Sequence, residues 1–324
     1  RLSMNHTKLT VSHAPFWHDG DSLFQKNINV ILALLPAAIF GILQFGAPAL
    51  GVLALSLSFA MLWETVINII TKKPLTIGDL DTAVIGLLFG MMLPAVTPWW
   101  LILVGTFVAV FIGKVIFGGT GTSPFNPALV GMAVLMMSWK LFFNFDAAYV
   151  NYEFGFMALA PLEAVKAQGA SAAQMFPLGD LLMGREVGGI GAVFGLGLII
   201  GGVYLILRGY ARWEIAGSFI AGILVTAFLF HVASPQTYAG PLFHLLSGYT
   251  LLGAFFLITE STTSPVNRTP MFIYGFLGGF MIILMRNVGA YADGTVLAIL
   301  LANLLTPLVD NIRPKALGKD MTHA

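Results

Sequence analysis

Long apolar runs are the feature of this sequence that most narrows its possible folds. Ten runs follow one another, and several approach the roughly 20 residues that a helix needs to cross a bilayer. They lie at 28–45, 48–70, 81–93, 98–117, 127–143, 188–207, 213–230, 240–259, 271–287 and 295–312. Only 10% of the residues are charged, compared with about 25% in soluble domains. The runs therefore predict an all-α polytopic membrane protein in contact with membrane lipid.

Five of these runs fall on the other five when the sequence is shifted by 167 residues. The shift pairs Asn126 with Asp293 (293 − 126 = 167) and places 28–45 on 195–212. Because five is odd, the second copy enters the membrane from the opposite side, as in many transporter folds. We therefore predict about ten transmembrane helices arranged as two inverted five-helix repeats.

Broken helices are expected within this plan. The run 81–93 has too few apolar residues to span a bilayer unaided, and Pro94 follows it directly. Proline removes a backbone donor and ends or kinks a helix. We predict a half-helix or a broken helix at this position.

The repeats divide the chain into an N-terminal segment 1–27, a first repeat 28–143, a linker 144–187, a second repeat 188–312 and a tail 313–324. With ten spans and the N-terminus inside, twelve Lys and Arg residues lie on the inner side and four on the outer side. Lys140, Lys166 and Arg185 lie in or beside the linker. When they are left out, ten spans place twelve Lys and Arg residues inside and one outside, whereas eight spans place nine inside and four outside. Since these residues favour the cytoplasm, we predict ten spans, cytoplasmic termini and an extracytoplasmic linker. The mostly polar first 27 residues predict no secretory signal peptide.

The composition excludes several classes of function. The chain has no cysteine, so it holds no cysteine-ligated iron–sulfur cluster. Its net charge of +1 does not favour nucleic acid as a partner. His231 and His244 flank one loop, but two histidines do not make a metal site, and we expect no bound metal.

Four polar residues are candidates for an ion path or for the ends of broken helices. Glu64 lies well inside an apolar run, where a carboxylate serves either as an ion or proton relay or in a satisfied interhelical hydrogen bond. Glu260 closes another run, where it caps a break or meets an ion. Asn126 and Asp293 stand before the last run of each repeat, and Asp293, directly before Gly294, is expected to be the N-cap of its helix.

The segment Gly118–Gly131, GGTGTSPFNPALVG, identifies a family. With the MAVLMMSW that follows, it resembles the glycine-rich loop and NPFNPA segment of the D subunit of the Rnf complex. It is also similar to the B subunit of the sodium-pumping NADH:quinone oxidoreductase. Three further strings agree in order along the chain: SHAPFWHDGDSL, KKPLTIGDLDTAVIGLLFGMMLPAVTPWW and ADGTVLAILLANLLTPLVDN.

The resemblance implies a membrane subunit of a redox-driven pump that couples electron transfer between ferredoxin and NAD to Na⁺ or H⁺ movement. It implies a place in the cell inner membrane, with other membrane, flavin-binding and iron–sulfur subunits as partners. The chain is then an enzyme only as part of this translocase.

One departure from the family concerns its flavin. The family attaches FMN by a phosphoester to a threonine in an S-G-A-T motif, followed by Pro-Leu or Ala-Leu. The corresponding stretch here is Met157–Leu162, MALAPL, so Ala160 takes the place of the threonine and Pro161 follows it. Alanine has no hydroxyl group, so we predict no covalent FMN at this position. FMN bound without a covalent link stays possible. The missing motif also leaves open a stand-alone transporter or channel with the inverted-repeat fold and no redox chemistry.

Overall fold

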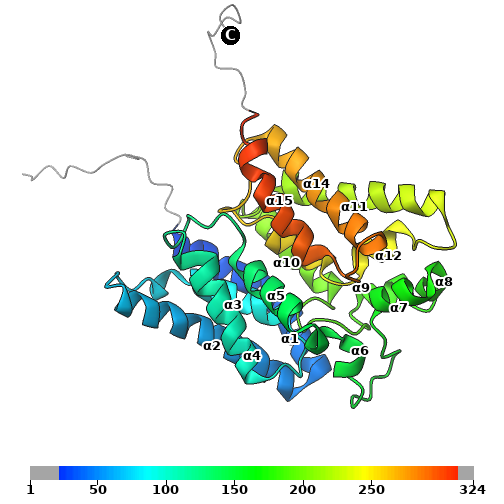
Figure 1. Ribbon diagram of the computed structural model, residues 1–324, viewed down its shortest axis with the longest axis horizontal. Coiled ribbons are helices and arrows are strands. Elements are labelled where there is room, and N and C mark those ends of the chain that lie inside the picture. The colour runs from blue at the N-terminus through cyan, green and yellow to red at the C-terminus, as the bar shows by residue number, and fades with distance from the viewer. Residues whose placement is uncertain (1–21, 313–324) are drawn as a thin grey trace, which may run out of the picture.

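The computed structural model describes residues 22–312, and every regular element in this part of the chain is a helix. Most of the predicted N-terminal segment 1–27 and the whole tail 313–324 lie outside the described residues, as does nearly all of the SHAPFWHDGDSL string. Figure 1 shows a first half, coloured blue to green, lying beside a second half, coloured yellow to red.

The first half contains the helices of the first five predicted runs. α1 covers Leu23–Phe45 and α2 covers Ala47–Ile70, and a 3₁₀ turn at Ile77–Asp79 precedes α3, Asp81–Met92. α4, Trp99–Phe107, continues as a π-helix at Val108–Val115, and α5 covers Pro127–Ser138.

The second half contains the helices of the other five predicted runs. α10 covers Gly195–Leu207, and α11 covers Trp213–Ala233. α12, Pro241–Leu246, and α13, Thr250–Leu252, are separated by a break, and a π-helix at Gly253–Leu257 continues α13. α14 covers Arg268–Asn287 and α15 covers Thr295–Val309.

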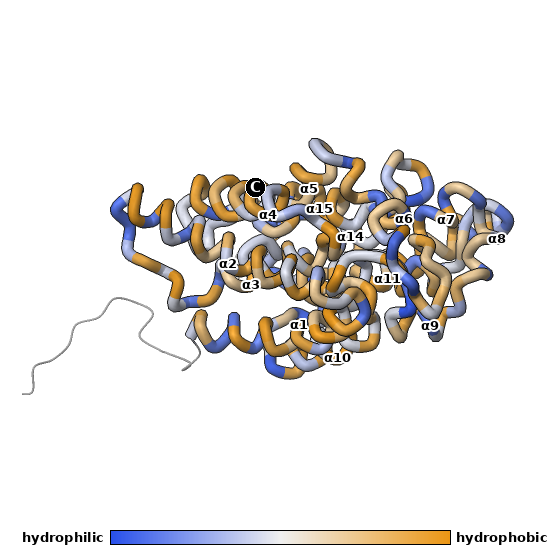
Figure 2. The backbone as a smooth tube through the Cα atoms, turned by 90° about the horizontal axis from the view of Figure 1, so that it is seen from below, coloured by the Kyte–Doolittle hydropathy of each residue, from blue (hydrophilic) through white to orange (hydrophobic). Residues whose placement is uncertain are grey.

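Short helices join the two halves and lie together at one end of the molecule (Figure 1). They are a 3₁₀ turn at Lys140–Phe143, α6 at Phe145–Ala148, α7 at Pro161–Gln168, α8 at Ala170–Ala173 and α9 at Leu178–Leu182. Figure 2 shows hydrophobic residues along most of the longer helices, with many hydrophilic residues among the linker elements.

Among residues 22–312, four helices are long and apolar enough to cross a membrane: α1, α2, α11 and α14. Five shorter apolar helices accompany them, at 81–92, 99–115, 127–138, 195–207 and 295–309. The chain is therefore a multi-pass membrane protein. The run 188–207 is longer than its helix, because residues 188–194 are not helical and α10 begins only at Gly195.

Glycines let α11 and α14 approach closely. A Cβ atom at Gly279 would lie 2.2 Å from the backbone oxygen of Phe219, and one at Gly222 would lie 2.4 Å from that of Phe276. Small residues at helix contacts are typical of membrane proteins, where close backbone packing replaces the hydrophobic effect as the source of association. These two glycines thus fix the main helix pair of the second half.

The predicted half-helix is present as α3, which has 12 residues and ends at Met92, two residues before Pro94. The carbonyl groups at its end are satisfied by the second half of the chain. The Tyr249 hydroxyl donates to the Met92 oxygen at 2.7 Å, and the amides of Ile190 and Gly191 donate to Leu93 and Met91 at 3.1 and 2.8 Å. Since unpaired backbone groups are costly at membrane depth, the end of α3 depends on these partners.

Asn126 makes a comparable contact from the first half of the chain to the second half. The Asn126 side chain accepts from the amides of Ala128 and Leu129 at 3.1 and 3.4 Å, so it caps α5. Its Nδ2 atom donates to the Leu257 oxygen at 3.1 Å, at the end of the π-helix that follows α13. Each half thus supplies a hydrogen bond to the end of a short helical segment in the other half.

Candidate functional site

Glu64 lies in a buried charge cluster between α2, α3 and the π-helix that follows α4. Its Oε1 atom accepts from Lys114 Nζ at 2.9 Å, and only 3% of either side chain is exposed. Lys114 also contacts Asp81 Oδ2 at 2.9 Å and donates to Thr82 Oγ1 at 2.8 Å. One ammonium group therefore faces two carboxylates. Because a buried charge without a partner is expensive, the Lys114 ammonium group offsets part of the cost of burying the Glu64 carboxylate.

A second cluster lies at the end of α14. The buried Arg286 guanidinium donates to the His244 backbone oxygen at 2.7 Å and to Thr250 Oγ1 at 2.7 Å. It also pairs with Asp293 Oδ1 at 3.0 Å. Asp293 in turn accepts from the amides of Thr295 at 3.0 Å and Tyr249 at 2.8 Å. Arg286 and Asp293 thus join the break between α12 and α13 to the start of α15.

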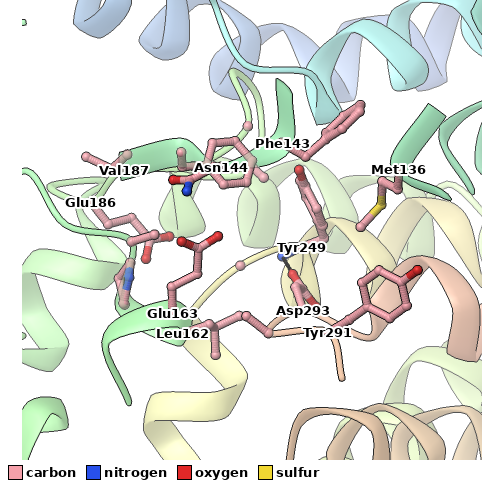
Figure 3. A pocket seen from close by; sticks show the side chains of 18 of the residues that line it. Met136, Phe143, Asn144, Leu162, Glu163, Glu186, Val187, Tyr249, Tyr291 and Asp293 are labelled. Atoms are coloured by element: carbon pink, nitrogen blue, oxygen red, sulfur yellow. Dashed lines mark hydrogen bonds between the residues drawn. The ribbon is translucent and has the colours of Figure 1, made fainter. Parts of the chain in front are cut away.

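Asp293 also lines a cavity of about 300 Å³, and residues of the linker form part of its wall. Ala160 and Pro161, at the start of α7, form one part of its wall. Figure 3 shows the ring of Tyr249 and the carboxyl groups of Glu163 and Glu186 at this cavity. Its volume is at the lower end of the range for small-molecule sites, and its mixture of aromatic and few polar groups is typical of them.

A lysine holds α7 against the second half of the chain. Lys166 Nζ donates to the backbone oxygens of Gly289 and Tyr291 at 2.6 and 2.7 Å. Burial, together with the nearby Lys140 charge, lowers the pKa of Lys166. Because α7 is fixed in this way, Ala160 and Glu163 keep their place at the cavity.

Two glutamates give the cavity its polar character. Glu186 is only 2% exposed, and its Oε2 atom has no hydrogen-bond partner among residues 22–312. Burial and the Asp293 charge raise the pKa of Glu186 well above its usual range. Burial and the Asp146 charge raise the pKa of Glu163. A buried carboxyl without a partner favours its neutral form, which can donate a hydrogen bond.

The residues predicted from sequence do not form one site. Asp293, Ala160 and Pro161 meet at the cavity. Glu64 lies instead in the buried group of Glu64, Asp81, Thr82 and Lys114, called the Lys114 cluster below. The remaining two positions lie elsewhere: Asn126 caps α5, and Glu260 Oε1 accepts from Thr262 at 3.0 Å. The N-cap of α15 is Gly294 and not Asp293 as predicted; Asp293 lies one residue earlier, where its Oδ1 atom accepts from the Thr295 amide at 3.0 Å. Within residues 22–312, no group of three or more His, Cys, Asp or Glu side chains is placed to hold a metal ion.

Sequence reasoning missed five charged residues of these sites. Lys114 and Arg286 carried a usable signal, since a cation inside an apolar run needs a buried partner. Asp146, Glu163 and Glu186 carried none, because acidic residues are ordinary in a polar linker. The cavity that unites the last two is made by segments far apart in the chain.

The chain is similar to known proteins along nearly its whole length. Residues 10–318 match the NQR2, RnfD, RnfE family. The D subunit of the Na⁺-translocating ferredoxin:NAD⁺ oxidoreductase complex of Acetobacterium woodii is 35% identical, over 95% of this chain and 94% of that protein. Its proton-translocating counterpart from Clostridium ljungdahlii is 32% identical, over 93% of each chain. The D subunit of the ion-translocating oxidoreductase complex of Cronobacter sakazakii is 31% identical, over 95% of this chain and 98% of that protein.

Proposed function

This chain belongs to the NQR2, RnfD, RnfE family, and from that premise we propose that it is the D-type membrane subunit of an ion-translocating ferredoxin:NAD⁺ oxidoreductase complex. The observation that carries the proposal is the agreement over nearly the whole chain with relatives named as such subunits. The chain takes part in electron transfer coupled to movement of Na⁺ or H⁺. It acts as an enzyme only within the complex.

We propose ten membrane spans in two inverted repeats in the cell inner membrane. Both termini then lie in the cytoplasm, and the linker lies on the extracytoplasmic side. The helix boundaries support the repeat: α2 and α11 begin 166 residues apart (213 − 47), and α5 and α15 begin 168 apart (295 − 127). Two pairs of corresponding helices, α1 with α10 and α5 with α15, are in contact. Such contacts are expected where two repeats meet around a pseudo-twofold axis.

Glu64 and Glu260 are proposed to offer carboxylates to the translocated cation. The Glu64 Oε1 atom already accepts from one cation, Lys114, and from Thr76. The buried Oε2 atom of Glu260 has no partner within residues 22–312. Asn126 and Asp293 hold the ends of the short helices between which such a cation would pass. Intramembrane carboxylates commonly mark ion pathways.

A flavin bound by this chain is proposed to be held without a covalent bond, FMN being the flavin that the resemblance implies. Covalent FMN does not fit, because Ala160 offers no hydroxyl group for a phosphoester. The aromatic wall of the cavity and its volume of about 300 Å³ suit a planar ring. A phosphate group suits this cavity less well, because the carboxyl groups of Glu163, Glu186 and Asp293 are among those that line it.

The partners that we propose are other membrane, flavin-binding and iron–sulfur subunits, since the relatives are named as subunits of a complex. The same names disfavour a stand-alone transporter or channel. Deletion of this chain tests the proposal. Membrane vesicles that lack it should lose ferredoxin-dependent NAD⁺ reduction, and the wild-type chain should restore it. Unchanged reduction in the deletion strain would refute the proposal.

A further inference from the structure

An exposed pair of aromatic rings lies where α11 and α14 begin. These two helices pack against each other (Figure 1). The Trp213 ring, at the start of α11, meets the Phe272 ring, one turn into α14, edge to face with the ring centres 5.8 Å apart. The two residues are 58% and 42% exposed. Because both helices are long and apolar enough to cross a membrane, exposed rings at their starts belong to the boundary between lipid and water.

Three exposed arginines lie at the same end of these helices. Arg268 is the first residue of α14, and Arg208 and Arg212 stand at the two ends of the turn that joins α10 to α11. This turn is tight, because the Tyr210 amide donates back to the Leu205 oxygen at 3.0 Å. The turn therefore keeps two guanidinium groups close to the start of α11.

The positive charge at this end exceeds the negative charge that pairs with it. Glu214 Oε1 lies 3.7 Å from Arg268 Nε, and the Glu214 side chain is only 7% exposed. Neither Arg208 nor Arg212 forms an ion pair within residues 22–312. Arg208 instead lies 5.9 Å from the centre of the Tyr210 ring. Two guanidinium groups are therefore left without an anion at the membrane boundary.

The surface that continues from the arginines along α14 is apolar. Phe272 and Phe276 are four residues apart, so they share one face of the helix, and Phe276 is 39% exposed. Guanidinium groups match the oxygens of a phosphate group with paired hydrogen bonds. A free phosphate would contact the arginines alone, whereas a phospholipid would also cover the aromatic rings with its acyl chains. The combination of both features favours a lipid.

We propose that this end of α11 and α14 binds an anionic phospholipid of the phosphatidylglycerol class. The lipid phosphate pairs with the guanidinium groups of Arg208 and Arg212, and the acyl chains lie against the rings of Trp213 and Phe272. A lipid with a net negative charge is favoured over a zwitterionic one, because the two arginines have no other anion. The surface lies outside the linker cavity and the buried charge clusters, so the proposal is independent of the redox function.

Native mass spectrometry of the purified full-length chain in detergent tests this proposal. Dioleoyl phosphatidylglycerol and dioleoyl phosphatidylcholine are added in equal amounts, because they share their acyl chains and differ in net charge. Each arginine near a membrane surface favours an anionic lipid by about fivefold, so phosphatidylglycerol should be retained at least about tenfold more than phosphatidylcholine. The double variant Arg208→Gln/Arg212→Gln leaves the pair of Arg268 and Glu214 in place, and in it the ratio should fall below about threefold.

Three matched variants complete the design. Arg208→Lys/Arg212→Lys keeps both positive charges, so it should keep most of the preference. Arg185→Gln removes an exposed arginine of the linker that already pairs with Asp180, so the ratio should stay unchanged. Trp213→Ala should weaken the retention of both lipids by the same factor, because both carry the same acyl chains. Thermal unfolding of each variant confirms that it is folded.

Three results would overturn the proposal. Equal retention of the two lipids by the wild type would mean that the arginines do not select an anionic headgroup. A preference that survives in Arg208→Gln/Arg212→Gln would place the anionic lipid elsewhere on the chain. Displacement of phosphatidylglycerol by added inorganic phosphate would mean that the arginines recognise a free phosphate and not a lipid. The proposed redox function stands or falls separately, with the vesicle assay.

Discussion

The hydroxyl group of Tyr249 donates a 2.7 Å hydrogen bond to the backbone oxygen of Met92, which joins the second half of the chain to the end of the half-helix α3. Both residues are buried. The bond satisfies a carbonyl group that the interrupted helix cannot pair by itself. The meeting point of the two halves is therefore held by polar contacts as well as by apolar packing.

Loss of this hydroxyl group should destabilise the protein. Tyr249→Phe leaves the Met92 oxygen buried and unpaired, which costs about 1–3 kcal/mol. Thermal unfolding in detergent should show a clearly lower midpoint. Tyr238→Phe is the control, because the Tyr238 hydroxyl has no hydrogen-bond partner within residues 22–312, and its midpoint should not move. Equal midpoints for the wild type and Tyr249→Phe would contradict the assignment.

The Lys114 cluster predicts strong coupling between its members. Lys114→Met leaves the carboxylates of Glu64 and Asp81 without their shared cation, which should cost about 3–5 kcal/mol. Lys114→Met/Glu64→Gln should recover part of this loss, because one of the two charges is gone. Unfolding measurements on the two single variants and the double variant form the cycle that isolates the pair.

An exposed ion pair serves as the comparison for this cycle. Arg185 and Asp180 lie 3.3 Å apart with 66% and 40% of their side chains exposed. Such pairs contribute about 0–1 kcal/mol, so Arg185→Met should change stability little. Strictly additive losses in the Lys114 cycle would show that Lys114 and Glu64 do not interact.

Glu163 should make stability depend on pH. Its pKa is raised by burial and by the Asp146 charge, so the folded state binds this proton more tightly than the unfolded state. Stability is then full below the ordinary glutamate pKa and is lost as pH rises through the raised value. Glu163→Gln removes this loss. The variant should unfold at the same temperature as the wild type at about pH 4 and at a higher temperature at about pH 8.

A destabilising effect of Glu163→Gln would refute the conclusion that the pKa of Glu163 is raised in the folded protein. A variant that is less stable than the wild type at about pH 8 would mean that ionised Glu163 is stabilised by a cation in the folded protein.

Covalent flavin should be absent from this chain. Ala160 cannot form a phosphoester, so no flavin should remain with the polypeptide after acid precipitation and denaturing electrophoresis. In-gel fluorescence should show no band at 34.7 kDa. A fluorescent band at this mass would mean that another residue carries the flavin.

Parts of the fold could be predicted because they depend on local chemistry. Pro94 predicted the end of α3, and the apolar runs predicted that α5 and α15 begin soon after Asn126 and Asp293. Each of these conclusions needed only the residue type and its distance from an apolar run.

The rest of the candidate site depends on contacts between distant residues. Glu64 was recognised as a buried carboxylate, but the choice between an ion relay and a satisfied contact required its partner Lys114, 50 residues away. The cavity combines Glu163 of the linker with Asp293, which follows α14. No periodicity or motif predicts which linker side chains face the second half.

Affinity purification of the tagged full-length chain from native membranes tests the central claim most directly. The chain should be recovered in fixed ratio with other membrane subunits and with proteins that carry iron–sulfur and flavin absorbance, and the preparation should reduce NAD⁺ with ferredoxin as donor. Recovery of the chain alone, with transport of a small solute after reconstitution, would contradict the account.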